Sequence, residues 1–165
     1  MQKTILKKGI AKTVFYENLM VSSPAFTAGG SIPNTYTCDG ANINPPLDIG
    51  DCPAEAVSLA ILVDDPNAPV GTWSHWVIWN IPVTSHIRSD HPHGEEGKND
   101  FQRNRYDGPC PHQGRHHYHF KVYALDCVLS LGGQTRQADL ERAIGGHILA
   151  FGELIGTYER QRGHL

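Results

Sequence analysis

A chain of 165 residues and 18.2 kDa has room for one domain with a buried core that needs no disulfide or metal to hold it together. Its formal net charge of −3 provides no basic surface for nucleic acid, and it contains no run of about 18 apolar residues that could cross a bilayer. The 17 glycines, 11 prolines and only 8% aromatic residues favour short strands and turns over a helical bundle. The ten histidines are the unusual feature, because their protonation near pH 6 would reverse the sign of the net charge.

Residues 1–20 are expected to form an N-terminal extension, followed by a single domain over residues 21–165. Four lysines lie among short apolar stretches at this end, without the apolar run of a secretory signal, so a cytoplasmic protein is predicted. In that compartment the cysteines are expected to be reduced thiols packed as small hydrophobic side chains, whereas an oxidising compartment would permit two disulfides. None of them lies in a CxxC pair: Cys38, Cys52, Cys110 and Cys127.

Several segments in the first two thirds of the chain predict strands and loops. Residues 21–56 are rich in Pro, Gly, Asn and Asp and should be irregular, with short strands at most. Residues 57–63 are almost wholly apolar, as in a central strand covered on both faces. A loop over residues 64–71 and a second strand over residues 76–81 follow, and the polar stretch 84–114 is expected to be irregular, functional or mobile.

The last third predicts one strand and one helix. Residues 117–125 alternate cleanly, with Tyr118 and Phe120 on one face and His117 and His119 on the other. A helix is predicted from an N-cap at Thr135, on apolar residues spaced by three and four: Leu140, Ile144, Ile148, Phe151 and Ile155. This interpretation puts Gly145-Gly146 inside the helix, ends it at Gly156 and leaves a terminal strand at 157–159. The residues therefore predict a mainly β, antiparallel domain with a helix near its C-terminus.

Four polar side chains lie at the ends of the predicted strands. Asp65 follows the first strand, His75 precedes the second, and His116 and Tyr118 share a face at the start of the third. If these strands are neighbours, the four side chains meet at one sheet edge. Protonated histidine, a phenol and the backbone N–H groups of the glycine-rich turn 108–115 can hold a phosphate or carboxylate without Lys or Arg.

Other chemistry stays open on the residues alone. A metal site is one alternative, because four histidines lie close together in the sequence: His112, His116, His117 and His119. A Cys110–His116 nucleophilic dyad is a weaker alternative, since Pro109 and Pro111 flank the cysteine and no third residue can be assigned to orient the histidine. His86, His91 and His93 are expected to be solvated surface residues. No GxSxG, P-loop or GxGxxG motif is present.

Three linked motifs resemble those of the phosphatidylethanolamine-binding proteins. The first is Asp65-Pro-Asn-Ala-Pro69, the second runs from Gly71 to Pro82, and the third is Gly108-Pro-Cys-Pro-His-Gln-Gly-Arg-His-His-Tyr118. Their order and spacing agree with the family from about Val21 to Arg160. Short matches at residues 36–40, 45–47 and 156–160 are similar to the bacterial and archaeal branch.

The resemblance implies a β-sandwich with a large central sheet, a smaller sheet and a C-terminal helical element. It also implies an anion pocket for phosphate, phosphoethanolamine or a phosphorylated ligand, with Asp65, His75, His116 and Tyr118 as ligand-binding residues and a wall shaped by Gly108 and Pro109. Asn67 replaces the second Asp of the first motif, and Cys110 stands where animal members have a second Pro.

We therefore expect an anion-binding protein without metal or cofactor and without catalytic residues. Some relatives inhibit kinases or proteases, so a protein partner is implied by resemblance alone, and a homodimer is left open. The alternatives are a hydrolase that uses Asp65 with His75 or His116 as acid and base, and a histidine-rich metal-binding β protein.

Overall fold

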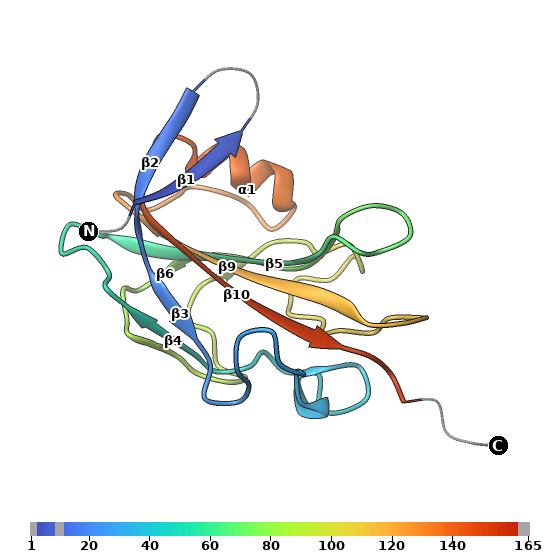
Figure 1. Cartoon of the computed structure of the whole chain (residues 1–165). Coiled ribbons are helices and arrows are strands. Elements are labelled where there is room, and N and C mark those ends of the chain that lie inside the picture. The colour runs from blue at the N-terminus through green and yellow to red at the C-terminus, as the bar shows by residue number, and fades with distance from the viewer. Residues whose placement is uncertain (1–2, 9–11, 162–165) are drawn as a thin grey trace.

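The structure is a computed structural model that describes residues 3–8 and 12–161. Within these residues two sheets pack across the main core, and one helix covers the outer face of the larger sheet (Figure 1). The smaller sheet has the order β3 (Met20–Ser22), β4 (Leu47–Gly50) and β7 (His86–Ile87). The larger sheet has the order β1 (Lys3–Lys8), β2 (Lys12–Asn18), β10 (Ile148–Tyr158), β9 (His116–Leu125), β5 (Ser58–Asp65), β6 (Trp73–Ile81) and β8 (Glu95–Glu96). The predicted mainly β fold with a large sheet, a small sheet and a C-terminal helix is confirmed.

One pair of strands departs from the predicted antiparallel arrangement. β2 runs parallel to β10, with Glu17 opposite Ala150 and Asn18 opposite Phe151, so the larger sheet is mixed. β2 leads through Leu19 directly into β3 of the smaller sheet, and the Leu19 N–H donates to the Phe151 carbonyl at 2.9 Å. The direction in which the chain enters the smaller sheet therefore fixes the direction of β2.

The central strand β5 is buried along all eight residues, as its apolar sequence predicts. Leu59, Ile61 and Val63 face the core between the two sheets. Ala60 and Leu62 face the second core, beneath the helix α1 (Gln137–Ile144). Burial on both faces explains why no polar residue alternates with the apolar ones in this strand.

The C-terminal region is where the sequence-based prediction of secondary structure is wrong. The helix ends at Ile144, Gly145 is its C-cap and Gly146 has a φ of 82°, so the glycine pair ends the helix instead of lying within it. Residues 148–158 form β10, which pairs with β9 along its whole length. Ala150 and Leu154 pack in the core between the sheets, whereas Ile148 and Phe151 pack in the second core, so apolar residues on both faces of β10 hide the period of two that marks a half-buried strand.

The start of the helix also lies one residue later than predicted. Arg136 is the N-cap, and its backbone N–H donates to the Asp139 carboxylate at 2.9 Å. The Thr135 hydroxyl instead donates to the Gly132 carbonyl at 2.6 Å, within the preceding turn.

The first strands form a hairpin inside the predicted N-terminal extension, with Lys3 opposite Glu17 and Lys8 opposite Lys12. Residues 1–2 and 9–11 of that extension lie outside the described residues, and the division of the chain after residue 20 stays a prediction. Among the described helical residues, none form a segment with the length and apolarity needed to cross a membrane.

The close approach of β10 to the start of the smaller sheet predicts the effect of one substitution. A Cβ at Gly152 would lie 2.4 Å from the Leu19 carbonyl oxygen, which is backbone and cannot rotate away. Gly152→Ala should therefore lower the free energy of unfolding by about 1–3 kcal/mol, measured by urea denaturation. The control is Gly132→Ala, where a Cβ meets nothing within 4 Å. Equal stability of the two variants would contradict this account of β10 packing.

Candidate functional site

Asp65, His75, His116 and Tyr118 lie together at one end of the larger sheet. They come from β5, β6 and β9, which are neighbours in the order β9-β5-β6. Since neighbouring strands run antiparallel here, the end of β5 at Asp65 lies beside the starts of β9 and β6. The structure thus brings together the four side chains that the strand pattern places at one edge.

A β-bulge directs His75 toward this group. Val63 pairs with Trp76, whereas the next residue, Asp64, pairs with Ser74, so that His75 has no partner of its own on β5. An extra residue of this kind re-aims its side chain. The His75 ring lies nearly perpendicular to the Tyr118 ring, with 5.3 Å between the ring centroids.

Asp65 and His116 form a close pair. The Asp65 Oδ2 atom lies 2.6 Å from the His116 Nδ1 atom, and the Asp65 Oδ1 atom accepts the Asn67 N–H at 2.8 Å. The His116 Nε2 atom faces the Gln113 carbonyl oxygen at 3.1 Å. Both ring nitrogens therefore face oxygen acceptors, an arrangement that a doubly protonated imidazolium beside an ionised carboxylate satisfies.

His75 is held in a different protonation state. Its Nδ1 atom lies 2.6 Å from the Asp107 carbonyl oxygen, which can only accept, so Nδ1 carries the hydrogen. Burial lowers the pKa of His75 below its ordinary value, and this outweighs the hydrogen bond to Asp107 and the charges of Asp65 and Asp107, which raise it. At neutral pH the ring is thus neutral, with Nε2 as a hydrogen-bond acceptor.

Tyr118 completes the group as a neutral phenol. The side chain is buried, and its ring stacks on the His116 ring with 6.4 Å between centroids. Burial, and next the charge of Asp65, raise the pKa of Tyr118, so that the phenol keeps its proton and can donate it in a hydrogen bond.

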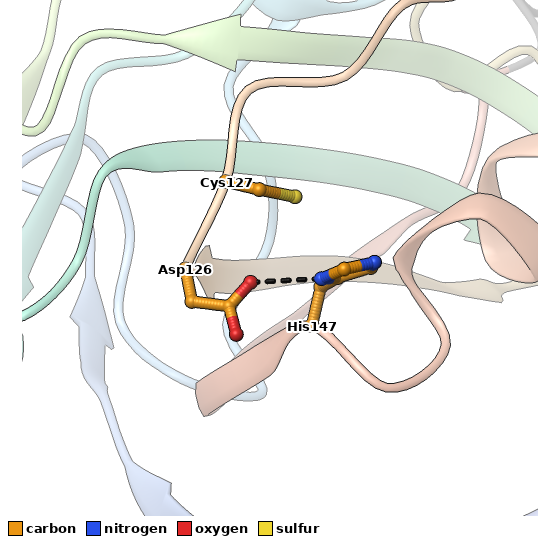
Figure 2. A group of neighbouring side chains, drawn as sticks. All are labelled: Asp126, Cys127 and His147. Carbon is orange, nitrogen blue, oxygen red and sulfur yellow. Dashed lines mark hydrogen bonds and ion pairs between the residues drawn. The ribbon is translucent and has the colours of Figure 1, made fainter.

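Two of the other described histidines, His117 and His119, are engaged outside this group. The His117 N–H donates to the Asn67 Oδ1 atom at 2.9 Å, and the His119 Nδ1 atom lies 3.3 Å from the Glu153 carboxylate. Within the described part of the chain, only one set of three potential metal ligands lies close together, Asp126, Cys127 and His147 (Figure 2). The exposure predicted for three further histidines is confirmed: His86, His91 and His93.

Gly108 and Pro109, which are predicted to shape the pocket wall, are held against the segment before β4. A Cβ at Gly108 would lie 2.1 Å from the Tyr36 carbonyl oxygen, so only glycine fits this approach. The Gly108 N–H donates to the Asn42 Oδ1 atom at 2.7 Å, and the Pro109 carbonyl accepts the Cys38 N–H at 3.1 Å.

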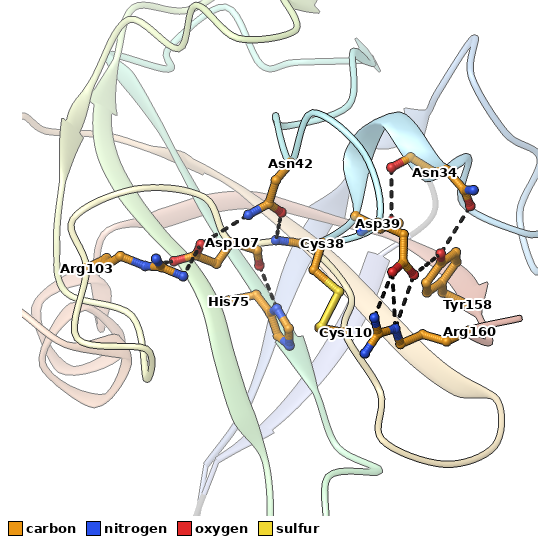
Figure 3. The surroundings of a disulfide bond; sticks show 12 residues. Asn34, Cys38, Asp39, Asn42, His75, Arg103, Asp107, Cys110, Tyr158 and Arg160 are labelled. Atoms are coloured by element: carbon orange, nitrogen blue, oxygen red, sulfur yellow. Dashed lines mark hydrogen bonds and ion pairs between the residues drawn. A yellow bond between two sulfur atoms is a disulfide. The ribbon is translucent and has the colours of Figure 1, made fainter. Parts of the chain in front are cut away.

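A disulfide strengthens the same connection and corrects the expectation of four reduced thiols. Cys38 and Cys110 are bonded across a sequence separation of 72, while Cys52 and Cys127 are free (Figure 3). The pairing depends on a tertiary contact between two loops, which no local pattern indicates. It also removes the Cys110–His116 dyad, because a disulfide sulfur is no thiolate nucleophile.

Asp107 is the residue at this site that the sequence did not reveal. It is 2% exposed, and its carboxylate accepts hydrogen bonds from four side chains: Asn42, Asn99, Arg103 and Arg105. Figure 3 shows the carboxylate between Asn42 and Arg103, and the backbone carbonyl directed at the His75 ring. Its place directly before Gly108 and Pro109 is the one sequence signal that could have identified it.

A hollow of about 310 Å³ lies beside His116. It is lined by Pro111, His112, Gln113, Gly114, Glu159 and Arg160. Asp65, His75 and Tyr118 are buried and are absent from its lining. Gln113 lines the hollow, and its carbonyl oxygen lies 3.1 Å from the His116 Nε2 atom. The Arg160 guanidinium is positioned by Asp39 at 2.9 Å, and a hydrogen bond from Tyr158, followed by those from Arg160, lowers the pKa of Asp39.

Fold and site together define a two-sheet β protein with a polar group at one end of its larger sheet, and comparison with known proteins agrees. The family model for phosphatidylethanolamine-binding proteins matches residues 22–159. A UPF0098 protein of Pyrococcus abyssi is 46% identical over 156 residues, which are 88% of each chain. A UPF0098 protein of Chlamydia muridarum is 40% identical over 149 residues, covering 86% of this chain and 99% of the relative.

Solved structures show the same similarity. A phosphatidylethanolamine-binding protein homologue of Chlamydia trachomatis has a TM-score of 0.84 at 38% identity, over 88% of this chain and 99% of that one. Escherichia coli YbcL, described as a member of the mammalian family, has a TM-score of 0.80 at 28% identity, over 87% of this chain and 99% of that one. The chain belongs to the phosphatidylethanolamine-binding protein family.

The neutral state of His75 predicts a loss of stability in acid. Its folded pKa lies below the ordinary value of 6.5, so the unfolded chain binds more protons as the pH falls. This contribution is complete above pH 6.5 and is lost as the pH drops through 6.5 toward the folded pKa. His75→Gln should reduce the slope of unfolding free energy against pH below pH 6.5, by at most about 1.4 kcal/mol per pH unit, measured in urea. The exposed variant His91→Gln should keep the wild-type slope; an unchanged slope in His75→Gln would show that His75 is not the titrating group.

Loss of the disulfide should destabilise the whole domain. Joint replacement of Cys38 and Cys110 by serine removes a cross-link that closes a long loop in the unfolded chain, and should cost about 2–4 kcal/mol of unfolding free energy. Cys127→Ser, which removes a thiol but no bridge, is the control, with both proteins measured in buffer that contains a metal chelator. Equal unfolding free energies for the two proteins would contradict a stabilising bridge.

Proposed function

We propose that the protein binds a small anion, either phosphate or a phosphorylated ligand such as phosphoethanolamine. The ligand-binding residues are Asp65, His75, Gly108, Pro109, His116 and Tyr118. The observation that carries the proposal is the position of the His116 ring. Its Nδ1 atom lies 2.6 Å from the Asp65 carboxylate, and its Nε2 atom is next to the carbonyl of Gln113, a residue that lines the hollow.

The Gln113 carbonyl occupies the position that a ligand oxygen would take. It belongs to an exposed turn in which Gly114 has a φ of 71°, and no Cβ contact restrains that glycine. When the turn moves outward, the His116 Nε2–H can donate to an anion in the hollow. Arg160 also lines the hollow and adds guanidinium N–H donors, although Asp39 balances its charge.

The deeper side chains suit a partly protonated phosphate. Tyr118 offers an O–H donor, and the neutral His75 ring offers an Nε2 acceptor for a phosphate O–H. The negative charge of Asp65 is balanced by the protonated His116 ring, so the anion does not meet an uncompensated carboxylate.

A phosphate titration tests the proposal directly. The imidazole NMR signals of His75 and His116 should shift and saturate on titration with inorganic phosphate or phosphoethanolamine near pH 6.5. His116→Gln should weaken binding about tenfold or more, because a hydrogen bond to a charged group contributes about 1.5–3 kcal/mol. The exposed variant His91→Gln should bind like the wild type. A folded protein whose two histidine signals do not move would contradict the anion site.

The hydrolase alternative makes a different prediction for the same residues. An enzyme that uses Asp65 with His75 or His116 as acid and base should hydrolyse a phosphoester or peptide, and Asp65→Ala should abolish that turnover. Saturable binding of phosphate without turnover of an aryl phosphate supports the binding protein instead. A regulatory or inhibitory role toward a kinase or protease, through a protein partner, belongs to the same proposal and rests on the family resemblance. A cytoplasmic location rests on the N-terminal sequence, which lacks the apolar run of a secretory signal, whereas the Cys38–Cys110 disulfide is more typical of an oxidising compartment.

A further inference from the structure

A second polar cluster lies at the opposite end of β9. Asp126 and Cys127 directly follow this strand, and His147 directly precedes β10 (Figure 2). One oxygen, one sulfur and one ring nitrogen of these residues all lie within 4.8 Å of one another. The Asp126 Oδ1 atom lies 2.8 Å from the His147 Nδ1 atom.

The backbone at all three residues is fixed by contacts that do not involve these side chains. The Asp126 N–H donates to the His147 carbonyl at 3.0 Å, and the His147 N–H donates to the Ile144 carbonyl at 2.9 Å. The Ser58 hydroxyl donates to the Cys127 carbonyl at 2.6 Å. The three side chains therefore need only torsional adjustment, and no backbone rearrangement, to meet at one point.

The set of donor atoms determines the kind of ion. A thiolate, an imidazole and a carboxylate suit zinc and similar divalent transition metals, whereas Ca²⁺ and Mg²⁺ prefer oxygen ligands. Bond lengths of about 2.0–2.3 Å in a tetrahedral site place ligand atoms about 3.5 Å apart. The Asp126–His147 pair must lengthen from 2.8 Å, and any pair near the 4.8 Å limit must contract. Both adjustments are within reach of half-exposed side chains, and the fourth position is left to water.

We propose that Asp126, Cys127 and His147 bind one zinc-like divalent ion, which closes the two ends of the segment that carries α1. Asp126 and His147 are 21 positions apart, and α1 lies between them. His116 and Asp126 are ten residue steps apart along extended strand, a distance of about 33 Å. The metal site is thus independent of the proposed anion site and does not rest on it.

Cobalt titration of the whole chain tests the proposal, because a cysteine thiolate bound to Co²⁺ gives a charge-transfer absorption band. In degassed buffer without reductant, Cys38 and Cys110 are paired, so only Cys52 and Cys127 can supply a thiolate. We expect a band that saturates at one equivalent, is displaced by Zn²⁺, is absent in Cys127→Ser and persists in the matched variant Cys52→Ser. His147→Gln and Asp126→Asn should each weaken binding about tenfold or more.

Three outcomes would overturn the site: no thiolate band in the folded wild type, cobalt binding without that band, or a band that survives Cys127→Ser. The proposed joining of the two ends of the α1 segment by the ion is tested separately, by thermal unfolding. Zn²⁺ should raise the thermal midpoint of the wild type and of Cys52→Ser but not that of Cys127→Ser. An equal rise in Cys127→Ser would show that zinc stabilises the fold elsewhere.

Discussion

A buried carboxylate, that of Asp107, joins the parts of the chain from which the candidate site is built. An unpaired charge in this position would cost several kcal/mol, so the surrounding segments must deliver donors to it. They do so from Asn42 in the segment before β4 and from Asn99 and the arginines at 103 and 105. The backbone of the same residue pairs with His75 through both its N–H and its carbonyl group. A long polar stretch with almost no regular secondary structure is thereby held against the end of β6.

The carboxylates at this end of the sheet are each paired with at least one basic side chain. Lys121 lies 2.8 Å from Asp64 on the helix-covered face, while His116 pairs with Asp65 on the opposite face. Since two arginines balance Asp107, the negative charge around His75 is largely compensated. Burial can then prevail over the neighbouring charges and keep that imidazole neutral. One histidine of the site is thus arranged as an acceptor and the other as a donor.

Sequence periodicity predicts the three central strands because their alternation or complete apolarity reflects which faces are covered. The same reasoning cannot orient His75: strict alternation puts it on the face of Val77 and Trp79, beneath the helix, and only the bulge turns it to Tyr118. Along β10, apolar spacing is compatible with both helix and strand, and pairing with β9 decides between them. The disulfide and Asp107 depend on contacts between loops far apart in sequence, which no local pattern contains.

The pairing of Asp65 with His116 explains what changes when Asn67 stands in place of the second aspartate of the first family motif. The Asn67 side-chain oxygen accepts the His117 N–H, and its own N–H binds Asp65, so the amide preserves the turn. A carboxylate in its place would add a negative charge beside Asp65, whose histidine partner is already engaged. A second carboxylate would attract a ligand amine and repel a phosphate. On the proposed function, the neutral amide therefore favours inorganic phosphate and simple phosphate esters over a headgroup that carries an ammonium group.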